Sequence, residues 1–86
     1  MQNTNELKAQ IRQLLVDSLM LQLKPAEIAD DVPLFGEGLG LDSVDALQLV
    51  VALEKNFGLK IKDADMAREV LKNVNAIAAA IENRPA

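Results

Sequence analysis

The sequence predicts an all-α fold, a small four-helix bundle of three main helices and one short helix, with a long loop between the first and second helices. Apolar residues recur at spacings of three and four in several segments, as they do on the buried face of an amphipathic helix. Half of the 86 residues are hydrophobic but only 2% are aromatic, a composition that suits helices better than a sheet. This length fits a single small domain, residues 1–86, near the lower limit for a self-sufficient core.

A first helix is expected from residue 5 to about residue 22. Asn3 followed by Glu6 resembles a capping box at its start, with Asn in the place of Ser or Thr. The core face of this helix is expected to carry Leu7, Ile11, Leu14, Leu15, Ser18 and Leu21. We expect the following loop to cover the end of the helix, because three apolar residues fall on its opposite side: Val16, Met20 and Leu23.

A long connection follows, from residue 24 to residue 42. Pro25 is expected to begin a short helical turn through Ile28, whereas Pro33 disfavours helix at Val32. A loop this long is unusual in a small domain unless it is functional or is held down by its own side chains. Six apolar residues are available to hold it down: Ile28, Val32, Leu34, Phe35, Leu39 and Leu41.

The second helix is expected from about Ser43 to Phe57, with Asp42 as its N-cap and Gly58 as its C-terminal stop. At about 100° per residue, its core face consists of Ala46, Leu49, Val50, Leu53 and Phe57. A second apolar stripe consists of Val44, Leu47 and Val51. This stripe is a docking surface if it is exposed and part of the core if the long loop covers it. The sequence favours neither alternative.

Two shorter helices are expected to complete the bundle. Asp63 is expected to cap a helix that ends near Leu71, with three residues facing inward: Ala67, Val70 and Leu71. Asn73 is expected to cap the last helix, in which four residues repeat at core spacing: Val74, Ile77, Ala78 and Ile81.

Composition and charge restrict the classes of function. The chain has no cysteine, so neither a disulfide framework nor a thiolate metal site is expected, and we expect no metal. The net charge is −4, and the segment between Lys24 and Lys55 contains acidic but no basic residues. Such a segment repels nucleic acid and attracts basic partners, although charge alone is explained more simply by a solvated acidic loop. No apolar run is long enough for a membrane span and no secretory leader is recognisable, so we expect a cytoplasmic protein.

Ser43 is expected on the first turn of the second helix, just after a glycine-rich run and between two acidic residues. A nucleophilic serine needs a base within hydrogen-bond reach, but the chain has no histidine, and Lys55 lies about three turns further along the helix. We therefore do not expect an enzyme. A serine at a helix start needs no special explanation. However, a helix N-terminus also favours an anion such as a phosphate-linked group, although Asp42 and Asp45 would repel it.

The run from Gly38 to Leu47 has the sequence Gly-Leu-Gly-Leu-Asp-Ser-Val-Asp-Ala-Leu and resembles the prosthetic-group attachment site of acyl carrier proteins. The helix layout agrees over nearly the whole chain, which implies one acyl-carrier-like domain. The resemblance implies that a phosphopantetheinyl transferase attaches 4′-phosphopantetheine covalently to Ser43, with coenzyme A as donor. Acyl groups would then travel as thioesters between enzymes of fatty-acid, polyketide or related lipid synthesis.

The resemblance also implies roles for the neighbours of Ser43. Asp42 would act as the helix cap and in recognition by the transferase. A monomer would dock on basic surfaces of acyl-transferring and synthase enzymes through Val44, Asp45, Leu47, Gln48, Val51 and Glu54. Gln48 and Lys55 stand where acidic residues are common in the family, which points to a specialised pathway. Room for a carried chain to fold back between helices is expected at Ala76, Ala78, Ala79 and Ala80.

Three alternatives stay open. A peptidyl carrier is disfavoured, because such carriers more often have Gly-Gly-x-Ser where this chain has Leu41-Asp42-Ser43. A D-alanyl carrier shares the Asp-Ser pair and the acidic surface. An unmodified helical protein-interaction module would keep the fold without the arm.

Overall fold

The computed structural model describes residues 4–35 and 38–83. These residues form four α-helices and one short 3-10 helix, with no strand among them, so the predicted all-α fold is confirmed. The long loop lies between the first two α-helices, as predicted. In chain order, the elements are α1 Thr4–Leu19, η1 Pro25–Glu27, α2 Ser43–Phe57, α3 Ala64–Val70 and α4 Val74–Glu82.

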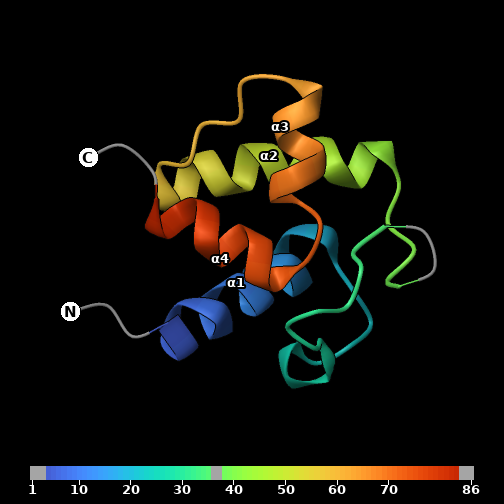
Figure 1. The fold of residues 1–86 in the computed structure, drawn as a ribbon. Coiled ribbons are helices and arrows are strands. Elements are labelled where there is room, and N and C mark those ends of the chain that lie inside the picture. The colour runs from blue at the N-terminus through green and yellow to red at the C-terminus, as the bar shows by residue number, and fades with distance from the viewer. Residues whose placement is uncertain (1–3, 36–37, 84–86) are drawn as a thin grey trace.

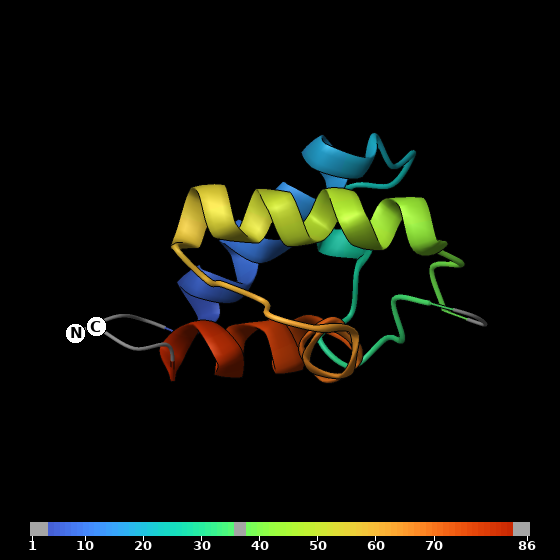
Figure 2. The same ribbon diagram turned by 90° about the horizontal axis from the view of Figure 1, so that it is seen from above.

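The helices pack around α1. It contacts both α2 and α4, and α3 contacts α4. In Figure 1, α1 and α4 lie side by side below α2, and α3 lies across the other helices near the start of α4. Figure 2 shows α3 nearly end-on while α2 and α4 are seen along their length, so α3 runs crosswise to both. The short α3 therefore contacts α4 and does not pack along α2.

The core is apolar and draws on every α-helix and on the loops. Burying this aliphatic surface is the main force that holds the bundle together. The described residues include no buried polar or charged side chain. The predicted core positions in α3 and α4 are confirmed, apart from Ala67, which is only partly buried. The largest fully buried side chains are Leu7, Ile11, Leu15, Leu34, Leu49, Leu53, Leu71, Val74, Ile77 and Ile81.

The end of α1 differs from the prediction. The helix stops at Leu19, and Met20 adopts a left-handed backbone with φ 51°. The N–H of Leu21 then donates to the carbonyl of Val16 at 3.1 Å, which is the long hydrogen bond of a Schellman-type helix end. This turn directs the Met20 side chain into solvent, where it is 86% exposed. The expectation that the loop covers Met20 is wrong, whereas Val16 and Leu23 are partly buried against the core.

The long loop is held down by its own side chains, as predicted. Pro25 begins the 3-10 turn η1. The loop's six apolar residues are buried or pack against the core: Ile28, Val32, Leu34, Phe35, Leu39 and Leu41. Backbone hydrogen bonds add to this, because the N–H of Leu34 donates to the carbonyl of Lys72 and the N–H of Leu41 donates to the carbonyl of Leu34, each at 3.1 Å.

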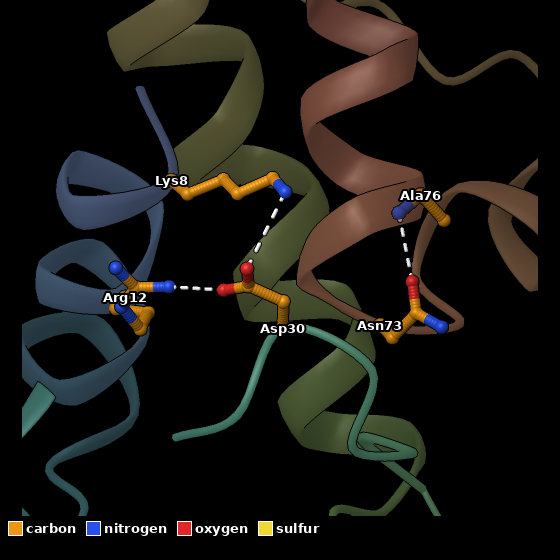
Figure 3. Close-up of polar contacts among 5 residues, drawn as sticks. All are labelled: Lys8, Arg12, Asp30, Asn73 and Ala76. Carbon is orange, nitrogen blue, oxygen red and sulfur yellow. Dashed lines mark hydrogen bonds and ion pairs between the residues drawn. The ribbon is translucent and has the colours of Figure 1, made fainter. Parts of the chain in front are cut away.

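Asp30 links the loop to two helices. Its carboxylate accepts hydrogen bonds from Arg12 and, at 3.3 Å, from Lys8, both on α1 (Figure 3). Its backbone carbonyl accepts from the N–H of Asn75 in α4 at 3.0 Å. One carboxylate of the acidic central segment is therefore paired with α1.

Figure 3 also shows the confirmed α4 cap, in which the Asn73 side chain accepts from the N–H of Ala76 at 2.8 Å.

Candidate functional site

Ser43 is the first residue of α2, and it is exposed. Asp42 is the N-cap, and its Oδ1 accepts hydrogen bonds from the backbone N–H groups of Val44 and Asp45 at 3.0 and 3.1 Å. In return, Oδ2 of Asp45 accepts from the backbone N–H of Asp42 at 3.1 Å, which completes a capping box. The predicted cap is confirmed, and it fixes where α2 begins.

The cap occupies the amides that the sequence suggested for an anion. The N–H groups of Val44 and Asp45 are bonded to the Asp42 side chain, and that of Ala46 donates to the Asp42 carbonyl at 3.0 Å. A phosphate on Ser43 would have to displace the Asp42 carboxylate to reach the amides of Val44 and Asp45. A group attached to Ser43 would therefore extend away from these two amides.

The loop before Ser43 is shaped by a close backbone approach. The N–H of Leu39 donates to the carbonyl of Pro33 at 3.0 Å. A Cβ atom at Gly38 would lie 1.6 Å from the Pro33 carbonyl oxygen, so only glycine fits there. Leu41 is 8% exposed and is anchored in the core. This anchoring places Asp42 and Ser43 at the surface. Gly36 and Glu37 lie outside the described residues.

Among the described residues, no base is hydrogen-bonded to the hydroxyl of Ser43. The chain contains no histidine, and the neighbouring carboxylates of Asp42 and Asp45 are used in the capping box. Nucleophilic catalysis by a serine needs a base that is hydrogen-bonded to the hydroxyl and a further group that orients the base. The described residues therefore do not show the hydrogen-bonded arrangement that such catalysis requires.

A hollow of about 710 Å³ opens beside Ser43, between α2, α3 and the long loop. This volume is within the usual range of small-molecule sites, roughly 300–1,000 Å³. Its lining is mostly apolar, and it differs from the expected one, because none of the four alanines predicted in α4 contributes. The lining consists of Pro33, Phe35, Leu41, Asp42, Ser43, Ala46, Ala64, Ala67, Arg68, Leu71 and Lys72.

The second apolar stripe of α2 is exposed. Val44, Leu47 and Val51 are 63%, 66% and 54% exposed, so the long loop does not cover them. Gln48 and Glu54 are also exposed. On a helical wheel, five of the six predicted docking residues fall within an arc of about 120°. The sixth, Asp45, lies outside that arc and is half-buried.

The core face of α2 is as predicted. Leu49 and Leu53 are fully buried, and three residues are partly buried against the core: Ala46, Val50 and Phe57. Ala52, which the sequence did not place, is also buried. Gly58 ends the helix with a left-handed backbone, φ 68°, and its N–H donates to the carbonyl of Glu54 at 3.0 Å.

Sequence reasoning missed Arg68 and Lys72 as neighbours of Ser43. They are more than twenty residues away along the chain, and they reach the hollow because its lining includes α3 as well as the first turn of α2. A pattern within one helix cannot predict this placement.

The described residues include no cluster of three His, Cys, Asp or Glu side chains that would hold a metal ion.

Comparisons with known proteins agree with this geometry. A family model described as the phosphopantetheine attachment site matches residues 9–81, a span that includes Ser43. The chain belongs to the acyl carrier protein family. An acyl carrier protein of Thermosynechococcus vestitus is 31% identical over 84 residues, which cover 98% of each chain. An acyl carrier protein of Akkermansia muciniphila is 33% identical over 78 residues, which cover 91% of each chain.

A further relative is named for a polyketide synthase. The polyketide-8 synthase acyl carrier protein 2 of Streptomyces avermitilis is 41% identical over 59 residues. The match covers 69% of this chain and 64% of that relative. The match with this relative is therefore higher in identity but shorter than the matches with the acyl carrier proteins of T. vestitus and A. muciniphila.

Family membership establishes 4′-phosphopantetheine as the prosthetic group and the carriage of acyl groups as the role. The site suits this group, because an exposed hydroxyl stands beside a largely apolar hollow. When attached, the group supplies a thiol, and the chain itself has no cysteine. Carrier proteins in general work with a phosphopantetheinyl transferase and with synthase enzymes. Among the described residues, no helix combines the length and the apolar character that crossing a bilayer requires.

Proposed function

We propose that this carrier holds its 4′-phosphopantetheine arm on the hydroxyl oxygen of Ser43. In the attachment step, this oxygen forms a bond to the phosphorus that carries the pantetheine group in coenzyme A. The bond from that phosphorus to the nucleotide breaks, adenosine 3′,5′-bisphosphate leaves, and the serine proton passes to solvent. Ser43 remains linked through a phosphodiester. The observation that carries the proposal is the exposed position of Ser43 on the capped first turn of α2, beside the hollow.

Intact-mass measurement tests the attachment. The purified chain is incubated with coenzyme A, Mg²⁺ and a phosphopantetheinyl transferase of broad specificity. The chain should gain the mass of one phosphopantetheine group, and the variant Ser43→Ala should gain none. An unchanged mass for the wild-type chain would favour an unmodified interaction module instead.

We propose that partner enzymes dock on the exposed stripe of α2 through basic surfaces of their own. The apolar part is Val44, Leu47 and Val51, and Glu54 supplies negative charge at its edge. An exposed apolar patch with a charged rim is typical of docking surfaces. Asp45 contributes chiefly through the cap, because it lies outside the arc of the other docking residues.

We also propose that the chain serves a specialised pathway and not the general fatty-acid cycle. Gln48 and Lys55 are exposed on the docking side of α2, which lowers the negative charge there. The similarity to a carrier named for a polyketide synthase is in keeping with this proposal. Mass spectrometry of the thioester cargo released from carrier isolated from its native cells tests it. Straight-chain fatty acyl groups of every intermediate length would contradict it.

The expected cytoplasmic location stays a prediction.

A further inference from the structure

Two basic side chains line the same hollow as Ser43. Arg68 belongs to α3, and Lys72 follows it. They are notable because the segment between Lys24 and Lys55, which contains all of α2 before its last turn, has no basic residue. Among the described residues that line the hollow, the only basic ones are therefore Arg68 in α3 and Lys72 just after it.

The phosphodiester of an arm on Ser43 is negatively charged, and α2 does not balance that charge. The amides of Val44 and Asp45 are used by the Asp42 carboxylate. The carboxylates of Asp42 and Asp45 themselves repel a phosphate on the neighbouring residue. Among the described residues that line the hollow, cationic partners for the phosphate are found only across it from α2.

Arg68 and Lys72 are available for that role. The guanidinium of Arg68 is 3.8 Å from the Asp65 carboxylate, and both side chains are more than four-fifths exposed, so the pair is loose and easily exchanged. The Lys72 ammonium has no ion-pair partner in the part of the chain that the structure describes. Both side chains are long and flexible. An arginine matches phosphate oxygens with paired N–H donors, and a lysine adds a mobile point charge.

We propose that Arg68 and Lys72 bind the phosphodiester of the arm and direct the arm across the hollow instead of into open solvent. This inference rests on the proposed attachment at Ser43. The apolar wall of the hollow then lies along the path of the arm, with Ala64 and Ala67 of α3 on one side and Ala46 of α2 on the other. The two basic residues position the arm and take no part in chemistry.

Phosphorus NMR of the carrier with its arm attached and its thiol free tests the contact. We compare the wild type with the double variant Arg68→Gln/Lys72→Gln. The matched control is Lys60→Gln/Lys62→Gln, which removes the same charge from the loop after α2, away from the lining. In the wild type and the control, the phosphorus resonance should move as salt rises from about 0.05 M to about 1 M, because screening weakens the contact. In the double variant, the resonance should stay near that of a free pantetheine phosphodiester at both salt concentrations.

A nitroxide attached to the arm's thiol tests the direction of the arm. In the wild type and the control, it should broaden the amide signals of Ala64 and Ala67, and this broadening should fall at least twofold in Arg68→Gln/Lys72→Gln. The charge-preserving variant Arg68→Lys/Lys72→Arg should keep both the salt response and the broadening. Because all four substituted residues are exposed, the midpoint of thermal unfolding should stay unchanged and serves as the folding check.

The proposed attachment at Ser43 and the proposed role of Arg68 and Lys72 are contradicted by different results. A chain that never gains the arm gives no phosphorus signal, which overturns the attachment at Ser43. A chain that carries the arm, but whose phosphorus resonance and nitroxide broadening are the same in the wild type and the double variant, overturns the role of Arg68 and Lys72 alone.

Discussion

The Asp42 carboxylate accepts two backbone hydrogen bonds at the start of α2, and the neighbouring Ser43 side chain is left exposed. Because this cap uses amides of the first turn, it also keeps them from a phosphate on Ser43. One side chain thus sets the beginning of the helix and occupies two amides that a phosphate on Ser43 would otherwise reach. The cap at Asp42 was predicted from a few neighbouring positions in the sequence, because a cap is a local structure. Its pairing with Asp45 was not predicted and comes from the structure.

Two substitutions separate the capping role of Asp42 from the effect of its negative charge. Asp42→Ala removes the acceptor and should lower the free energy of unfolding by about 1 kcal/mol, the usual cost of a lost N-cap. Asp42→Asn keeps an acceptor oxygen and should stay within about 0.5 kcal/mol of the wild type. Urea denaturation measures both. If the transferase recognises the negative charge, Asn should slow arm attachment while leaving the stability intact. Equal destabilisation by the two substitutions would contradict the capping role.

At the scale of the element, α2 has one face in the core and one in solvent. Leu49 and Leu53 are fully buried, while Leu47 and Val51 are more than half exposed. Helical spacing predicted both faces, since side chains three and four residues apart share a side. It did not predict whether the second face is covered, because that depends on the path of a loop far away in the sequence. The structure shows that the loop leaves it open.

Three truncations in α2 distinguish its faces. Leu53→Ala should lower the free energy of unfolding by about 3 kcal/mol, because a fully buried leucine is removed. Val51→Ala should change it by less than about 0.5 kcal/mol, as expected for an exposed position. Phe57→Ala should fall between the two, because Phe57 is only partly buried. Denaturant titrations measure all three. A loss at Val51 as large as that at Leu53 would show that the stripe is covered in solution.

At the scale of the whole molecule, the features that the sequence did not predict come from contacts between distant segments. Arg68 and Lys72 line the same hollow as Ser43, and Asp30 is paired with Lys8 and Arg12 of α1. Each depends on how distant segments of the chain pack together, which propensity and periodicity do not specify. Room for the carried chain was expected near the alanines of α4. The hollow is instead lined by α3, and none of those alanines contributes to it. The starts of α2, α3 and α4 and most core positions were predictable because caps and spacings are local, whereas the end of α1 at Leu19 was not predicted.

The charge distribution of the molecule predicts how docking responds to salt. Glu54→Lys reverses a charge on the exposed face of α2 and should slow acyl transfer with partner enzymes that have basic docking surfaces. The effect should be larger at low salt than at high salt, since screening shortens the range of the charge. Glu27→Lys, an equal reversal on the exposed η1 turn, is the matched control and should have a smaller effect. Transfer rates for Glu54→Lys that equal the wild-type rates at every ionic strength would contradict electrostatic docking at this face.

The attachment of the arm to Ser43 underlies the proposed carrier function and the proposed role of Arg68 and Lys72, and fragment mass spectrometry of the arm-bearing chain tests it most directly. The chain has only two serines, Ser43 on the exposed first turn of α2 and Ser18, which is half-buried in α1. We predict that every fragment carrying the added phosphopantetheine mass contains Ser43. Modified fragments that contain Ser18 or another residue but lack Ser43 would contradict the account.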